Sequence, residues 1–179
     1  WLPSFMLPTD PSPVLFVSYF YGIILLVGGI AGIWLGAVVT DKLGETDKTI
    51  YGRAPAYSFI ATIPFFLIGI LSNSLIIVFF SFMIIQALSF VMMGPLVSSL
   101  QHIVGPNMRA TTSAIALFIN NLVGIGLGNL LIGILSDVLS AQFAEEALRY
   151  SIASGVIFYI FAAILFLFAA RNLESDWQN

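Results

Sequence analysis

The chain has 179 residues, of which 59% are hydrophobic and 8% are charged, with a mean hydropathy of +1.03 and a formal net charge of −3. A water-soluble domain carries about 25% charged residues, so this composition excludes an ordinary soluble protein and predicts a chain that lies in a membrane. The small net charge gives no reason to expect a nucleic-acid partner. The chain contains no cysteine, which excludes disulfide bonds and thiolate metal sites.

Proline, glycine and charged residues divide the sequence into five apolar segments, called here the first to fifth spans. We expect them at residues 13–40, 56–71, 75–100, 110–136 and 149–170. Backbone groups in lipid must be hydrogen-bonded within the protein, and these segments are too long and too apolar for barrel strands. The sequence therefore predicts an all-α integral membrane fold, with one transmembrane bundle over residues 13–171.

The basic residues predict the orientation of this bundle. Five of the six lie after the first and third spans or at the C-terminal tail: Lys42, Lys48, Arg53, Arg109 and Arg171. The opposite side holds Arg149. Because cytoplasmic loops are enriched in Lys and Arg, we expect the C-terminus and the tail, residues 172–179, to be cytoplasmic and the N-terminus to be external.

An external N-terminus without a signal peptide suggests that a further helix precedes the chain, which starts at Trp1 rather than Met. We interpret residues 1–12 as the end of that helix and an external loop. The ends of two spans are also alike: Gly36 to Asp41 reads GAVVTD, and Gly133 to Asp137 reads GILSD, with the two aspartates 96 positions apart. Such likeness fits the inverted repeats of secondary transporters, although glycine-rich helices also resemble one another by chance.

Two stretches resemble the major facilitator superfamily of transporters. Asp41-Lys42-Leu43-Gly44 is similar to the loop signature between the second and third helices of each half. The run from Met108 to Asp137 resembles the eleventh helix of spinster-like members, and residues 145–152 resemble the segment before their twelfth helix. The resemblance implies helices eight to twelve of an incomplete C-terminal six-helix bundle, whose partner is the missing N-terminal half of the same transporter.

The signature departs from the family pattern at two points. Ala37 stands where the leading glycine is expected, and Glu45-Thr46-Asp47 replaces a basic cluster. The resemblance nevertheless implies a secondary active transporter that works by rocker-switch alternating access on an amphipathic organic solute or lysolipid-like substrate. It also implies an integral, multi-pass protein of the bacterial inner membrane, surrounded by lipid.

The resemblance further implies a cytoplasmic gate, formed by Asp41, Lys42, Gly44 and Arg109. In this interpretation Asp41 accepts hydrogen bonds from a neighbouring helix N-terminus and pairs with Arg109 while the transporter is open outward. A helix N-terminus attracts a nearby anion by about 0.3–1 kcal/mol. The alternative is a solvated interfacial ion pair that contributes about 0–1 kcal/mol.

Polar side chains in the middle of the spans are the candidates for contact with substrate, because such residues are costly in lipid. Gln86, Asn120 and Asn121 are the main candidates, and Tyr21 is a weaker one. Interhelical hydrogen bonding is an equal alternative for the three amides. For Tyr21 an interfacial or packing role is favoured.

Glycines spaced by four residues predict close helix packing. They are Gly28, Gly32 and Gly36 in the first span and Gly124 and Gly128 in the fourth. The Gly94-Pro95 pair predicts a hinge in the third span, because proline removes a backbone donor.

All nine acidic residues lie at the ends of spans or in loops: Asp10, Asp41, Glu45, Asp47, Asp137, Glu145, Glu146, Glu174 and Asp176. The lone His102 has no second ligand at a useful spacing. We therefore expect no catalytic residue, metal site or cofactor, and we place any proton-coupling carboxylate in the missing half. An intramembrane enzyme would need a catalytic cluster that the sequence lacks. The main alternative to transport is a membrane scaffold assembled through the glycine faces.

Overall fold

The structure is a computed structural model that describes residues 14–143 and 147–176. Five helical stretches in it are long and apolar enough to cross a membrane: Ser18–Gly44, Ile50–Leu71, Leu75–Ile103, Pro106–Ser140 and Arg149–Leu173. The predicted all-α fold with five spans is confirmed. No β-strand occurs in the described ranges.

The first span consists of α2 (Val14–Ile23), the π-helical segment η1 (Ile24–Gly28) and α3 (Gly29–Gly44). The second is α4 (Ile50–Leu71). It begins before the expected residue 56, and Pro55 lies within its first turns and does not interrupt it. The third consists of α5 (Leu75–Phe90) and α6 (Met93–Ile103).

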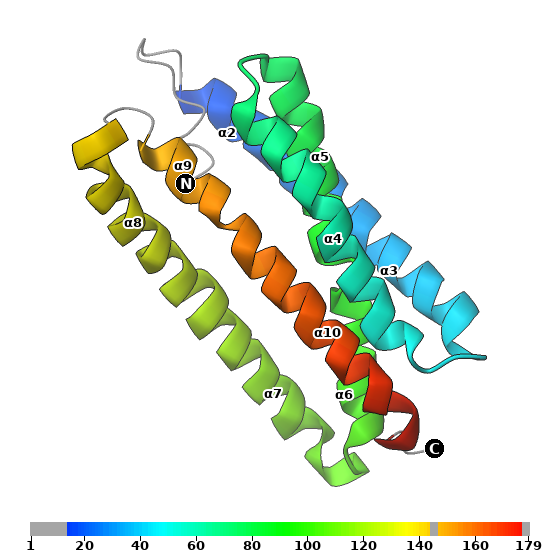
Figure 1. Ribbon diagram of the computed structural model, residues 1–179. Helices are drawn as coiled ribbons and strands as arrows, with labels where there is room; N and C mark the ends of the chain where they lie inside the picture. The colour runs from blue at the N-terminus through cyan, green and yellow to red at the C-terminus, as the bar shows by residue number, and fades with distance from the viewer. Residues whose placement is uncertain (1–13, 144–146, 177–179) are drawn as a thin grey trace.

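The fourth and fifth spans complete the bundle. The fourth contains the short 3₁₀ turn η2 (Pro106–Met108), α7 (Arg109–Ile119), the π-helical segment η3 (Asn120–Leu127) and α8 (Gly128–Phe143). The fifth contains α9 (Ala147–Ser154) and α10 (Val156–Asp176). The spans run alternately up and down, and α7 and α8 form one edge of the molecule (Figure 1).

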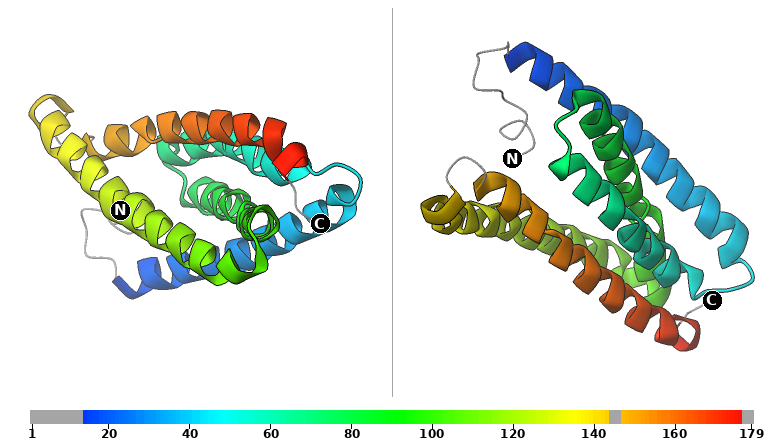
Figure 2. Two further views of the ribbon diagram at one scale, coloured as in Figure 1. Left: turned by 90° about the horizontal axis from the view of Figure 1, so that it is seen from below. Right: turned by 45° about the horizontal axis from the view of Figure 1, so that its top comes forward.

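The third span lies between the first span and the pair of α4 and α10, as the view along the bundle shows (Figure 2). Helices α4 and α10 pack closely because Gly52 admits Ala170, whose Cβ would lie 2.7 Å from a Cβ built on Gly52. Rings of Phe59 and Phe66 contact Tyr159 of α10, with centroids 5.8 and 5.5 Å apart. These contacts join the second and fifth spans along their length.

An apolar core fills the space between α4, α5, η1 and α9. Its buried members are Ile24, Phe66, Ile70, Val78, Phe82, Ile85 and Ile152. Buried hydroxyls elsewhere in the bundle donate to carbonyls of their own helices: Thr62 Oγ1 to Ser58 at 2.8 Å and Ser151 Oγ to Ala147 at 2.8 Å. These polar side chains are therefore satisfied without water.

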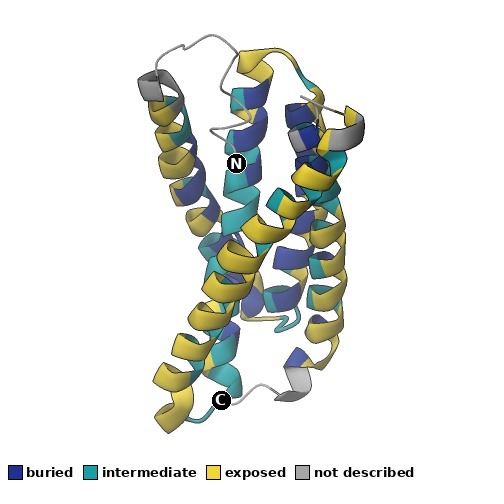
Figure 3. Ribbon diagram, turned by 90° about the vertical axis from the view of Figure 1, so that its left-hand side faces the viewer, coloured by how far each residue is buried: buried dark blue, intermediate teal, exposed yellow. Residues whose placement is uncertain are grey.

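The fourth span differs from the others in its exposure. In the most apolar stretch of the fourth span no residue is buried, whereas half of the residues in the corresponding stretch of the second span are buried. Figure 3 shows this helix crossing one face of the molecule with exposed residues along most of its length. It contacts α6 near one end and α9 near the other.

Charged residues lie at the ends of the described spans. We call the end of the bundle that carries Lys42, Lys48, Arg53, Arg109 and Arg171 the basic end. At the opposite end, the Arg149 guanidinium donates to Asn73 Oδ1 at 3.2 Å and links the fifth span to the turn between α4 and α5. Between these two ends, residues 18–40, 54–71, 75–101, 110–136 and 150–170 carry no Asp, Glu, Lys or Arg.

Candidate functional site

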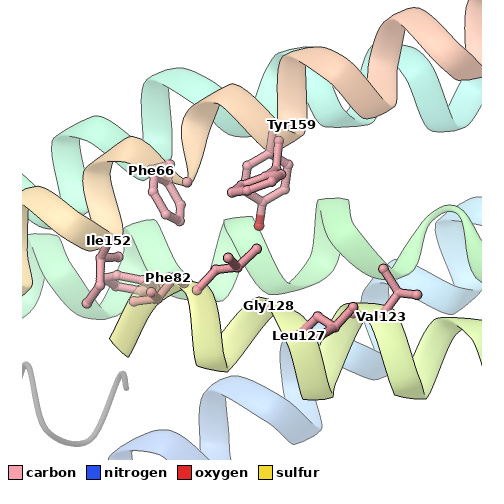
Figure 4. A pocket seen from close by; sticks show the side chains of 12 residues that line it. Phe66, Phe82, Val123, Leu127, Gly128, Ile152 and Tyr159 are labelled. Atoms are coloured by element: carbon pink, nitrogen blue, oxygen red, sulfur yellow. The ribbon is translucent and has the colours of Figure 1, made fainter. Parts of the chain in front are cut away.

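A large cavity of about 550 Å³ lies between the second, third, fourth and fifth spans. Its lining includes Phe66 and Phe82 on one side and Val123, Leu127 and Gly128 on the other (Figure 4). The lining is almost wholly apolar. Such a cavity suits hydrocarbon groups and has no charged side chain with which to bind an ion.

Tyr159 supplies a polar group at this cavity. Its hydroxyl points toward the space between the helices in Figure 4, on the side of Ser89. Sequence reasoning missed Tyr159, because a tyrosine within an aromatic span is more typical of packing.

A second, smaller pocket of about 180 Å³ lies between α6 and α7. Asn120 lines it, together with Gln101 and Ser113. Asn121 is exposed, and its side-chain amide donates to the Leu117 carbonyl at 2.8 Å. The two amides thus share a segment of the fourth span, and Asn120 is the one that faces a pocket.

The other two substrate-contact candidates lie elsewhere. A Cβ built on Gly28 would lie 2.9 Å from the Cβ of Gln86, so Gln86 sits at the contact between the first and third spans. Tyr21, in α2, is half-buried. The structure does not bring Gln86 together with Asn120.

Three glycines of the first span lie against the third span. A Cβ on Gly32 would overlap the Ala87 carbonyl, and one on Gly36 would overlap the carbonyl oxygen of Val91. Gly124 and Gly128 do not make such contacts, since the nearest heavy atoms to added Cβ atoms are 3.8 Å away and belong to the fourth span itself. Both residues line the large cavity instead. The expected close packing of another helix on Gly124 and Gly128 is therefore not seen among the described helices, because the fourth span diverges from its neighbours there.

The third span is broken between α5 and α6, at Val91 and Met92. Pro95 has no N–H with which to bond the carbonyl of Val91, four residues earlier, and helical bonding resumes with Leu96 N–H to the Met92 carbonyl at 2.9 Å. Gly94 lies opposite Ala37, whose nitrogen is 3.6 Å from an added Cβ. The break thus lies just before the Gly94-Pro95 pair.

The loop at the basic end has a defined structure. Gly44 is buried against the ring of Tyr51, whose Cε2 would be 2.6 Å from an added Cβ. The Lys48 ammonium donates to the Gly44 carbonyl at 2.7 Å. A side chain at the last glycine of the loop signature would therefore displace the Tyr51 ring.

Asp47 organises the start of α4. Its Oδ1 accepts from the Thr49 hydroxyl at 2.6 Å and from the Thr49 backbone N–H at 2.9 Å, and its Oδ2 pairs with Arg53 at 3.2 Å. The Thr49 hydrogen bonds, assisted by the Arg53 charge, hold the pKa of Asp47 below its ordinary value of 3.8. Sequence reasoning read this segment only as a departure from the family pattern, although an Asp two residues before a Thr is a known turn signal.

The residues predicted to form the gate lie at the basic end. Asp41 and Lys42 are exposed in the last turn of α3, and Arg109 is exposed at the start of α7. Asp41 and Arg109 both belong to the described residues, and no ion pair joins them. The gate therefore stays a prediction for a different conformation.

Comparison with known proteins finds similarity to membrane transporters. No protein-family model matches the chain. In sequence it is 27% identical over 167 residues to protein spinster homolog 3 of Danio rerio, covering 89% of this chain and 34% of that protein. It is 24% identical over 146 residues to an MFS-type efflux pump of Mycolicibacterium smegmatis, covering 82% of this chain and 34% of the pump.

Solved structures agree with this relationship. A bacterial homolog of the human lysosomal transporter Spinster, in an inward-facing and unoccupied conformation, matches 98% of this chain with a TM-score of 0.84 at 22% identity, over 44% of its own length. Its inward-facing and occupied form matches with a TM-score of 0.81 at 23% identity, over 46% of its length. The chain thus spans less than half the length of these relatives. It has the major-facilitator fold and resembles the spinster-like members of that superfamily.

Proposed function

We propose that this chain is the C-terminal half of a secondary active transporter and works by rocker-switch alternating access. The observation that carries the proposal is the match of the five spans to an inward-facing spinster homolog. In an inward-facing state the cytoplasmic gate is open, which agrees with the separation of Asp41 from Arg109. Placing the basic end in the cytoplasm follows from its Lys and Arg residues, and the bacterial inner membrane is the proposed location.

An amphipathic organic solute or a lysolipid-like molecule is the proposed substrate. The amide of Asn120, beside Gln101 and Ser113, offers neutral hydrogen-bonding groups next to apolar side chains. A polar head group with a hydrocarbon portion matches that combination. Asn120 and Asn121 are the proposed contacts, with Gln86 and Tyr21 reached as the spans move.

Coupling to an ion gradient requires a titratable or ion-binding group in the membrane. The described spans carry no carboxylate between their ends. We therefore place the coupling acid in the part of the transporter outside this chain. A native polypeptide of roughly two to three times 19.4 kDa would agree with the coverage of the relatives.

The test is transport by the full-length protein reconstituted in liposomes. Uptake of a fluorescent lysophospholipid and of a fluorescent amphiphilic amine is followed with and without a proton gradient. We expect gradient-dependent flux of at least one of them, with a raised KM in Asn120→Ala and an unchanged KM in the matched control Asn129→Ala, since Asn129 is exposed on α8.

A cysteine placed at Asn121 extends this test. Substrate should protect it from a thiol reagent if it faces the transport pathway. Absence of flux for every amphiphile, with no protection, would favour the scaffold interpretation instead.

A further inference from the structure

Two arginines lie at the basic end of the neighbouring helices α4 and α10. Arg53 directly precedes residues 54–71, and Arg171 directly follows residues 150–170, two segments without Asp, Glu, Lys or Arg. The start of α4 and the end of α10 lie side by side in Figures 1 and 2. Both arginines therefore stand at the depth where the apolar part of their span ends, which is the depth of lipid head groups.

The contact between Gly52 and Ala170 determines how these arginines are arranged. Arg53 and Arg171 are the next residues along their helices, and the two helices run in opposite directions. One residue turns the side-chain direction by about 100° in an α-helix. In an antiparallel pair, the two turns bring both side chains to the same side of the contact. Arg53 and Arg171 thus project from one side of the α4–α10 pair, and both are exposed.

Exposed apolar side chains continue this face from the arginines toward the middle of the spans. They lie three, four or seven residues from the arginine of their own helix, which places them on the same face. Their members are Tyr57 and Ile60 of α4 and Ile164 and Phe168 of α10. None of them lines either of the two pockets described above. The face thus has two charges at head-group depth, two aromatic rings next to them and aliphatic side chains beyond.

Contacts with neighbouring side chains orient both guanidinium groups. The Arg171 guanidinium carbon lies 5.2 Å from the centre of the Phe168 ring, a cation–π contact. Arg53 Nη1 pairs with Asp47 Oδ2 at 3.2 Å, yet the Arg53 side chain stays 48% exposed. Among the side chains that the structure describes, no carboxylate pairs with Arg171. A guanidinium has five N–H donors in a fixed fork, so both arginines have donors left for another anion.

We propose that Arg53 and Arg171 bind the phosphate of an anionic glycerophospholipid, whose hydrocarbon chains lie along the exposed face of α4 and α10. Phosphate oxygens accept hydrogen bonds from both guanidinium groups, and arginine suits this paired geometry better than lysine does. The bound lipid bridges the second and fifth spans at the basic end of the bundle.

Charge and shape both favour this occupant. The two arginines and Asp47 together leave one positive charge, which matches the single negative charge of a phosphodiester head group. A soluble phosphate would cover none of the apolar side chains beside the arginines, whereas the chains of a lipid cover them. The site lies on a different face from the pockets, and it requires neither transport nor a particular side of the membrane for the basic end.

Native mass spectrometry of the intact, full-length protein in neutral detergent tests the proposal. The protein is titrated with phosphatidylglycerol and, separately, with phosphatidylcholine. We expect Arg53→Gln/Arg171→Gln to raise the apparent Kd for phosphatidylglycerol about tenfold or more, because charge-assisted hydrogen bonds are lost. Its affinity for phosphatidylcholine should not change.

A matched control removes the same charge elsewhere at the basic end. Lys42→Gln/Arg109→Gln lies on the first and fourth spans, and it is compared for lipid binding alone. It should bind phosphatidylglycerol as the wild type does. An equal loss of affinity in both double variants would show a general attraction of anionic lipid to the basic end. That result, or an unchanged Kd in Arg53→Gln/Arg171→Gln, would overturn the proposal.

A thermal measurement separates a lipid from a soluble anion. At about ten times its Kd, phosphatidylglycerol should raise the Tm by about 2 °C more than phosphatidylcholine does. Arg171→Gln, which leaves the pair of Asp47 and Arg53 intact, should remove most of this difference. Millimolar glycerol 3-phosphate should not reproduce the rise. If it does, the site binds a soluble phosphate and the assignment to lipid is wrong.

Because neither measurement involves transport, their results are separable from those of the flux assay. Selective loss of lipid binding in the arginine variant supports the site whether or not an amphiphile is transported. Flux without that selectivity supports the proposed function and removes the lipid site.

Discussion

Gly36 lies directly against the carbonyl oxygen of Val91, at the point where the third span is broken. Pro95 leaves that carbonyl without its usual helical donor, and the lack of a side chain on Gly36 lets the first span approach it. The broken helix and the glycine face are therefore parts of one contact, and the two spans meet through backbone atoms at the break.

This contact predicts opposite effects for two glycine substitutions in α3. Gly36→Ala places a methyl group on the Val91 carbonyl, and we expect it to destabilise the purified protein by about 1–3 kcal/mol. Gly29→Ala meets no heavy atom within 4 Å, so it should be neutral or stabilising by about 0.5–1 kcal/mol. Thermal unfolding in one detergent compares them, and equal Tm values for the two variants would contradict the packing described.

The break in the third span gives a second prediction. Pro95→Ala restores an N–H that can donate to the Val91 carbonyl, so the span should straighten and transport should slow severalfold. Spin labels at Leu75 and Gln101, both exposed, should move apart in this variant. Pro64→Ala is the control, because α4 is continuous through Pro64. An unaltered label distance in Pro95→Ala would show that the break has another cause.

The loop before α4 should respond to acid. The folded-state pKa of Asp47 lies below its ordinary value of 3.8, so its stabilising effect is complete above that value and is lost as the pH falls through the lower, folded-state pKa. The Thr49 amide should therefore stay protected from hydrogen exchange down to about pH 4. Below that pH its exchange rate should change by more than the intrinsic pH dependence of amide exchange accounts for. In Asp47→Ala the amide should exchange fast at every pH, whereas Glu45→Gln should behave as the wild type.

The proposed gate predicts an exchange of charges. Asp41→Arg and Arg109→Asp should each reduce transport, and the double variant should recover part of it if the two side chains pair in the outward-open state. Because they do not pair in this conformation, a cysteine pair at these positions should crosslink only under conditions that favour that state. A double variant as inactive as the single ones, together with no crosslink, would argue against direct pairing.

The five spans could be predicted from the sequence because hydropathy over some 20 residues depends on composition alone. The ends of the spans were harder to predict from the sequence. Helix α4 begins at Ile50, because the turn at Asp47 fixes its start. Pro55 removes one backbone donor but does not end the helix. The resemblance to spinster-like transporters was also readable, from the run Met108 to Asp137.

The candidate site was harder to predict, because it depends on which helix faces which. Spacing by four marks Gly28, Gly32, Gly124 and Gly128 alike, yet two of them contact α5 and two face a cavity. The spacing of residues shows which of them share a helix face, but it does not show which helix packs against that face. The contacts of Tyr159 and Gln86 likewise require the packed arrangement.

The absence of charge between the ends of the described spans has an electrical consequence. Moving one elementary charge across a membrane potential of 100 mV involves about 2.3 kcal/mol. In the proposed alternating-access cycle, rocking this bundle would move no ionised side chain of the described spans through the membrane interior, so the potential would do little work on it. Any voltage dependence of the proposed transport would then come from the cargo, from a co-transported ion or from the rest of the proposed transporter.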